Sequence, residues 1–134
     1  MTDLTAYETI RDAISAISVT ADQVSPRDRF VHFDGPREDL LNAPDRSFLL
    51  VVTSGPMRFV ELTQARTMGL ELRVAYDDAE GSEARILGDN KRIEDAIDAL
   101  RGTLDHIEHQ NVTRDFLPGQ THLIRQLEAR YQEG

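Results

Sequence analysis

The chain has 134 residues, of which 40% are apolar and 29% charged, which is typical of one globular domain and not of a disordered chain. It contains no cysteine, which excludes disulfides, thiolate metal sites and a cysteine nucleophile. Its 15 basic and 24 acidic side chains give a net charge of −9, so the chain should repel nucleic acid phosphates.

The N-terminal segment MTDLTAYETIRDAI has neither the basic start nor the apolar run of a signal peptide. No apolar run in the chain approaches the roughly 18 residues of a membrane-spanning helix. We therefore expect a soluble protein that is not exported and has no membrane partner.

The first predicted element is a helix that begins near Thr5. Thr5 and Glu8 have the spacing of a capping box, in which each side chain bonds a free backbone N–H at the start of a helix. Apolar side chains then recur every three or four residues, as on one face of a helix, at Tyr7, Ile10, Ile14 and Ile17. The segment SPRD from Ser25 ends this pattern.

Three strands are predicted next. Arg29–Phe33 reads as a short strand, and one helical turn is expected near Glu38–Leu41. Ser47–Ser54, SFLLVVTS, has five consecutive apolar residues and predicts a strand that is buried on both faces. Thr67–Tyr76 alternates, which predicts a strand with one face on the core, formed by Met68, Leu70, Leu72, Val74 and Tyr76.

The segment between the last two strands, GPMRFVELTQAR at 55–66, is too long for a tight hairpin. It carries apolar side chains that water alone would solvate poorly, at Met57, Phe59, Val60 and Leu62. Two interpretations remain open. Either the strands extend into a projecting β-arm, or another subunit covers this apolar tip.

The strongest helical pattern lies in the second half of the chain. Asp89 or Asn90 is expected to cap this helix, whose apolar face would be formed by Ile93, Ile97, Leu100, Leu104 and Ile107. Residues 121–131 fit a helix or a strand, and the turn-like LPGQ before them favours a strand. The predicted order is α-β-β-β-α-β, a single α+β domain over residues 1–134 with two main helices on one face of a mostly antiparallel sheet.

An acidic cluster follows the third predicted strand, and it consists of Asp77, Asp78, Glu80 and Glu83. Three interpretations are open: an ordinary solvated loop, which we favour, a functional negative surface, and a catalytic or metal site. An EF-hand counted from Asp77 fails, because Ala79, Gly81 and Gly88 stand where oxygen ligands are required.

Other chemistry-bearing patterns are also absent from the sequence. His106 and His109 are three apart on the predicted second helix, but no third ligand has a recognisable spacing, so a surface pair is favoured over a zinc site. Ser54 lacks the G-x-S-x-G nucleophile elbow, and no phosphate-binding glycine motif occurs. We expect no enzyme, no catalytic residue, no metal and no cofactor.

The order of elements nevertheless resembles one family. The series TAYETIRDAI, RSFLLVVTSG, RTMGLELRVAYDD and ILGDNKRIEDAIDAL is similar to the tail terminator proteins of long-tailed phages and related gene transfer agents, over about residues 5 to 131. In that family a leading helix precedes an Arg-aromatic strand, an alternating strand that ends in Tyr, a helix that opens on Asp, and a closing strand.

The resemblance implies a structural role in the neck of a virion that is assembled in the host cytoplasm. Such proteins form a hexameric ring that ends the tail tube, stops its polymerisation and docks on the head connector, while DNA passes through without specific binding. Met57, Phe59, Val60 and Leu62 would then contact a neighbouring subunit or the tube protein, and Glu71 and Arg73 would pair across subunits. The cluster Asp77, Asp78, Glu80 and Glu83 would line the DNA channel or its rim, where like charge keeps the duplex free to slide.

Three rivals come from other classes of protein. One is a different neck or head-completion protein of the same particle, and another is a non-viral oligomeric module that binds proteins through its sheet. The third is a metal-dependent hydrolase that uses the acidic cluster.

Overall fold

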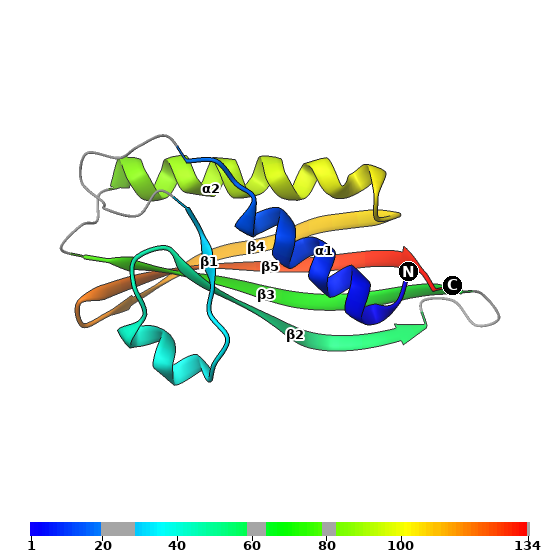
Figure 1. Cartoon of the computed structure of the whole chain (residues 1–134), viewed down its shortest axis with the longest axis horizontal. Helices are drawn as coiled ribbons and strands as arrows, with labels where there is room; N and C mark the ends of the chain where they lie inside the picture. Colours follow the sequence, from blue (N-terminus) through cyan, green and yellow to red (C-terminus); the bar gives the residue numbers. More distant parts are fainter. Residues whose placement is uncertain (20–28, 59–63, 79–82, 134) are drawn as a thin grey trace.

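The computed structural model describes residues 1–19, 29–58, 64–78 and 83–133 (Figure 1). In this part of the chain, five strands form one sheet in the order β1-β2-β3-β5-β4. β1 is parallel to β2, and the other neighbouring strands are antiparallel. The elements are α1 (Asp3–Ser15), β1 (Val31–His32), η1 (Arg37–Asn42), β2 (Ser47–Arg58), β3 (Ala65–Asp77), α2 (Glu83–Asp98), η2 (Ala99–Gly102), β4 (His106–Leu117) and β5 (Gln120–Gln132). The predicted α+β class and element order are confirmed, and the predicted closing strand is β5, the second arm of a hairpin.

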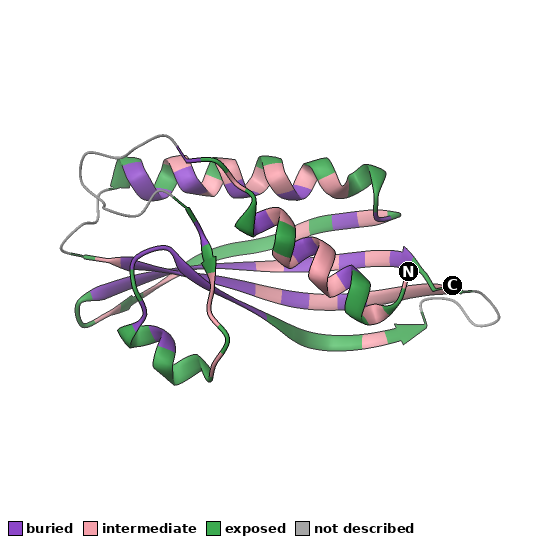
Figure 2. Cartoon of the chain, viewed as in Figure 1, coloured by how far each residue is buried: buried purple, intermediate pink, exposed green. Residues whose placement is uncertain are grey.

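Both main helices cover the same face of the sheet (Figure 1). Burial is concentrated on the helix sides that face the sheet and along the middle strands β3 and β5 (Figure 2). The core between the two layers includes Ile10, Ile14, Ile93 and Ile97 from the helices and Phe48, Leu70, Leu72, Leu123 and Leu127 from the strands. Among the described helices, none is long and apolar enough to cross a membrane.

α1 begins earlier than the sequence predicts. Thr2 is its N-cap, and the Thr2 hydroxyl accepts a hydrogen bond of 3.0 Å from the backbone N–H of Thr5. The predicted cap at Thr5 is therefore wrong, because Thr5 lies inside the first turn and its backbone N–H is the group being capped. The predicted apolar face is confirmed at Ile10 and Ile14, which are fully buried.

This cap gives a first prediction. Thr2→Ala should lower the free energy of unfolding by about 1 kcal/mol, since the N–H of Thr5 loses its acceptor. Thr9→Ala is the matched control, because the Thr9 hydroxyl donates to the Thr5 carbonyl within the helix and alanine is the better helix former. Urea denaturation followed by circular dichroism measures both, and equal losses for the two variants would contradict the assigned cap.

The two ends of the chain meet beside the start of α1 (Figure 1). The amino group of Met1 donates to the carbonyl of Gln132 at 3.0 Å. Asp3 accepts two hydrogen bonds from Arg66 of β3, at 2.8 and 3.1 Å, and one from Tyr131 of β5 at 2.5 Å. These bonds tie α1 to the two middle strands of the sheet.

β2 and β3 continue into this segment, with Met57 opposite Thr67 and Arg58 opposite Arg66, and β3 stays paired with β5 there, with Arg66 opposite Tyr131. The strands therefore extend as the β-arm interpretation of the 55–66 segment expects, but up to Arg58 and Ala65 they remain in the sheet and do not project from it, while Phe59, Val60 and Leu62 lie outside the described residues. The prediction that β2 is buried on both faces holds only for Ser47–Leu50 and is wrong beyond them. The reason is that β1 pairs only with Ser47 and Phe48, which leaves the rest of β2 at the edge of the sheet.

α2 is already helical at Glu83 and ends at Asp98, so both predicted limits of this helix are wrong. The apolar spacing continues past its end because Leu104, in a turn, and Ile107, in β4, also reach the core. Asp89, the expected cap, lies in the middle of the helix and is fully buried. A carboxylate can occupy that position only because other elements supply its partners.

The face of the sheet opposite the two main helices is its second face. One end of this face is covered by the segment between β1 and β2. The predicted helical turn near Glu38–Leu41 is confirmed as η1. The apolar contacts here form a small separate cluster of Phe33, Leu40, Ala43, Leu49 and Ala75. β3 is therefore buried on both faces near its end, and not on one face only as the alternation predicts.

Candidate functional site

The acidic cluster lies at one end of the sheet, and its described members are bonded within the chain. The backbone N–H of Asp77 donates to Asp45 at 2.8 Å, and the hydroxyl of Thr121 donates to Asp78 at 2.9 Å. Glu83, at the start of α2, accepts from Arg114 of β4 at 2.6 and 2.7 Å. Glu80 lies outside the described residues. The structure thus does not bring the three described carboxylates together around a common point, and among the described residues no group of three metal-ligating side chains occurs.

A buried ion pair lies behind this cluster. Arg85 of α2 donates to both carboxylate oxygens of Asp45, at 2.7 and 3.2 Å, and both side chains are at most 5% exposed. The Arg85 guanidinium also lies over the ring of Tyr76, 5.1 Å from its centre. Asp45 follows η1, Arg85 lies in α2 and Tyr76 lies in β3. The Arg85–Asp45 ion pair therefore connects the η1 segment, the sheet and α2.

A second buried pair lies next to the first. Arg46 donates to Asp89 of α2 at 2.7 and 3.2 Å, and the two side chains are 1% and 0% exposed. Asp89 also accepts from the Tyr76 hydroxyl at 2.8 Å and from Arg92 at 2.9 Å. Burial raises the pKa of Tyr76 well above its usual range, and the negative charge of Asp89 adds to this effect. Every oxygen of Asp89 is engaged, so this group holds the fold together and has no lone pair directed at a ligand.

The second face of the sheet carries Glu71 and Arg73, the predicted subunit contacts. Arg73 is only 4% exposed, and its Nη1 lies 3.3 Å from Asp115 and 2.9 Å from Nδ1 of His122. Glu71 accepts from Gln126 at 3.2 Å. Pairing of Glu71 and Arg73 across subunits would therefore compete with partners that they already have in their own chain.

His122 is held in its neutral form by these neighbours. Its Nδ1 accepts from Arg73, so the ring proton is on Nε2, which donates to Gln120 at 3.0 Å. Burial and the adjacent charge of Arg73 lower the pKa of His122 to about 4. A proton on this ring would place two cations side by side in a site that is 2% exposed.

His106 and His109 lie on β4, and not on a helix as predicted. Nδ1 of His109 accepts from Arg125 at 2.8 Å, and its Nε2 donates to Asp98 at 3.0 Å, which lowers the pKa of Asp98. Arg125 also donates to the carbonyl and side-chain oxygens of Asn90. His109 thus connects a buried arginine of β5 to a carboxylate of α2, while His106 contacts Glu108 at 3.3 Å.

Several of the large apolar side chains that remain exposed lie along the edges formed by β2 and β4, while Leu4, Val31 and Leu41 are exposed on α1, β1 and η1. On the β2 edge these are Val51, Val52 and Met57, which are 38%, 37% and 56% exposed. On the opposite edge β4 exposes Val112 and Phe116, at 40% and 74%, and Leu87 of the adjacent α2 is 57% exposed. Figure 2 shows both edges coloured as exposed along much of their length.

Sequence reasoning found Met57 but missed the apolar residues of the β4 edge. Val112 and Phe116 precede the LPGQ turn, which signals a hairpin, yet nothing local to a strand says whether another strand lies beside it. β4 is an edge strand because β5, and not β4, pairs with β3, and this pairing is known only from the tertiary structure.

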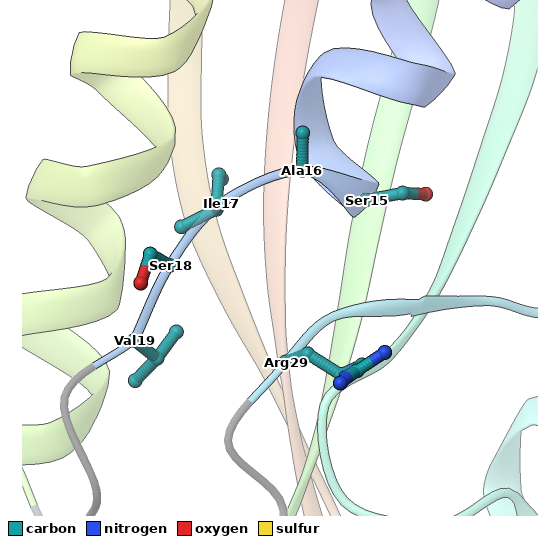
Figure 3. Close-up of a pocket in the computed structure, with 6 residues that line it drawn as sticks. All are labelled: Ser15, Ala16, Ile17, Ser18, Val19 and Arg29. Atoms are coloured by element: carbon teal, nitrogen blue, oxygen red, sulfur yellow. The ribbon is translucent and has the colours of Figure 1, made fainter.

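A shallow hollow of about 250 Å³ lies at the end of α1 (Figure 3). Its lining consists of Ser15, Ala16, Ile17, Ser18, Val19 and Arg29. Both lining segments border residues 20–28, which lie outside the described part of the chain. We therefore assign no ligand to it.

No protein-family model matches the chain, and no curated protein matches it. A crystal structure from Akkermansia muciniphila is similar to 72% of this chain, with 15% identical residues and a TM-score of 0.35. The match covers 47% of that protein, so the chain spans about half of its length. A likeness of this degree carries no argument about fold or function.

Proposed function

We propose that the protein is a structural component of a phage-like particle, a ring at the head-proximal end of the tail tube that ends tube polymerisation and joins the tail to the head connector. The observation that supports this proposal most directly is the pair of free sheet edges. One chain presents exposed valines and a methionine on one edge and an exposed valine and phenylalanine on the other. A subunit with two different edges that are complementary to each other can repeat head to tail, and such contacts form a ring when the rotation between subunits closes.

The distribution of charge agrees with a ring that lets DNA pass. The net charge of −9 gives the assembly a negative field, and a DNA duplex in its channel would find no favourable binding position. Asp78 is exposed, and the side chain of Glu83 is 69% exposed, so both reach solvent at the same end of the sheet. The acidic cluster then serves as channel wall or rim.

Native mass spectrometry of the purified chain, together with negative-stain images, tests the proposal. A discrete closed ring, hexameric by the family resemblance, is the expected result, and the same protein should not retard duplex DNA in a gel at moderate salt. A monomer at every concentration up to the solubility limit would contradict the ring, and tight DNA binding would contradict the role of its channel.

A further inference from the structure

We propose that the ring is closed by pairing of the free part of β2 in one copy with β4 of the next copy, so that the sheets join edge to edge; this inference rests on the proposed ring. The partner is thus a second copy of this chain. The free part of β2 begins after Leu50, whose carbonyl accepts from the Tyr7 hydroxyl at 2.7 Å. Both strands present backbone N–H and C=O groups that no other described strand occupies.

The directions of the strands fit a head-to-tail repeat. β2 is antiparallel to β3, β3 to β5 and β5 to β4, so β2 and β4 run in opposite directions. When one copy follows the next in the same orientation, β4 meets β2 in the antiparallel sense. The alternation of the sheet therefore continues through the junction without a break.

One exposed valine of each edge lies on the helix-covered face of the sheet, whereas Val51 and Met57 of β2 are opposite Glu71 and Thr67 on the other face. Val52 is opposite Leu70 and Val112 is opposite Arg125, and both partners lie on the helix-covered face. Arg125, which is opposite Val112, contacts Asn90 of α2, and Arg114 of β4 binds Glu83 at the start of that helix. The part of α2 that contains the exposed Leu87 therefore runs along the part of β4 that contains Val112. A joined sheet would bury Val52 of one copy beside Val112 and Leu87 of the next.

The charges of the two edges are complementary. β2, SFLLVVTSGPMR, has no acidic residue and ends in the exposed Arg58. The other edge carries exposed carboxylates, with Glu108 of β4 at 53% and Glu94 of α2 at 42% side-chain exposure. An antiparallel register with Val52 opposite Val112 brings the Arg58 end of β2 toward the His106–Glu108 end of β4. Because Pro56 lacks an N–H and β2 has bulges between Val52 and Met57, the backbone ladder should be short and centred on Val52.

Single charges placed on each edge test this pairing. Val52→Asp damages only the β2 edge and Val112→Asp only the β4 edge, so each variant alone should lose the ring and run as a monomer in native mass spectrometry. An equimolar mixture retains one intact β2 edge and one intact β4 edge, and it should give a heterodimer and nothing larger. Leu4→Asp, at a side chain that is 66% exposed on α1, is the control and should assemble as the wild type.

The outcomes distinguish failure of the proposed β2–β4 interface from failure of the proposed ring. If the wild type forms a ring but only one of the two variants disrupts it, or the mixture stays monomeric, the edge pairing is overturned and the proposed function stands. A monomeric wild type counts against both proposals. The two variants should keep the wild-type circular dichroism spectrum and melting temperature, since both positions are exposed in the single chain.

Disulfide cross-linking detects the proposed pairing directly. Because the chain has no native cysteine, only the introduced cysteines can form disulfides. Three double variants each combine Val52→Cys with one cysteine in β4, at position 110, 112 or 114. Together they test the proposed register and the two registers beside it. Under a mild oxidant, at least one variant should give a ladder of covalent oligomers on a non-reducing gel, because a disulfide forms only when the Cα atoms lie about 4.4–6.8 Å apart. Leu4→Cys with Val112→Cys is the matched control. No ladder from any of the three register variants in a preparation that contains rings would overturn the pairing.

Discussion

Replacing Asp89 with alanine is expected to lower the free energy of unfolding by about 3–5 kcal/mol, because it removes one partner of a buried ion pair. Asp89 is fully buried and binds Arg46, Tyr76 and Arg92 at once. Arg46, which is 1% exposed, loses two hydrogen bonds and an adjacent negative charge when this carboxylate is removed. Since a domain has only about 5–15 kcal/mol of stability in total, the loss removes a large part of it.

Urea denaturation followed by far-ultraviolet circular dichroism measures this loss. Asp95→Ala is the matched control on the same helix, because its side chain is 62% exposed and pairs with Lys91 on the surface, so it should cost under about 1 kcal/mol. Asp89→Asn keeps the shape and one acceptor and should fall between the two, which leaves a measurable variant if Asp89→Ala does not fold. A loss of less than about 1 kcal/mol for both Asp89 variants would show that the pair contributes little.

Acid should destabilise the protein between pH 6.5 and pH 4 through His122. Its folded-state pKa of about 4 lies below the 6.5 of the unfolded chain, so the unfolded state binds more protons in this window. The stability that His122 contributes is therefore complete above pH 6.5 and is lost as the pH falls toward 4. The difference in pKa corresponds to about 3 kcal/mol.

Burial of the ring is the largest cause of the lowered pKa of His122, and the charge of Arg73 of β3 is the next. Asp115 of β4 opposes this shift, and Arg37 of η1 adds to it more weakly than Asp115 opposes it. His32, whose pKa burial also lowers, adds to the loss in the same window. The carboxyl groups with lowered pKa values, Asp3 and Asp98, act only below about 3.8 and do not overlap with it.

The measurement is the free energy of unfolding in urea at a series of pH values from 7 to 4. His122→Asn cannot be protonated and should have a much flatter profile than the wild type. His106→Asn, at a side chain that is 43% exposed, should give a profile parallel to that of the wild type. A His122→Asn profile that falls as steeply as the wild-type profile would assign the acid sensitivity to other groups.

Some elements could be predicted from local pattern alone. The alternation of Thr67–Tyr76 matches β3 to within two residues at its start and one at its end, because the side-chain period of a strand is a property of consecutive residues. The choice of strand over helix for 121–131 is confirmed by β5, and it depended on the LPGQ turn that joins it to β4. The limits of α2 could not be found in this way, since Leu104 and Ile107 keep a helical spacing although the chain has already turned back.

The acidic cluster shows the same limit for the candidate site. The sequence shows the carboxylates at positions 77, 78 and 83, but it does not show that Thr121 and Arg114, more than 30 residues away, bind two of them. It also gives no sign that Asp45 and Asp89 are the buried acids, because burial depends on which arginines the fold brings to them. The number of acidic residues in a segment can be read from that segment alone. Which of their charges remain exposed depends on contacts with residues far away in the sequence.

By itself, the sequence determined the fold class, the alternation of the strands, the face of α1 and the excess of negative charge, because each follows from residues close together in the chain. Only the tertiary structure decided which strands lie at the edges of the sheet, which carboxylates are neutralised and which apolar side chains stay exposed. The order β1-β2-β3-β5-β4 is fixed by pairings between residues far apart in sequence, and the two free edges are a consequence of that order.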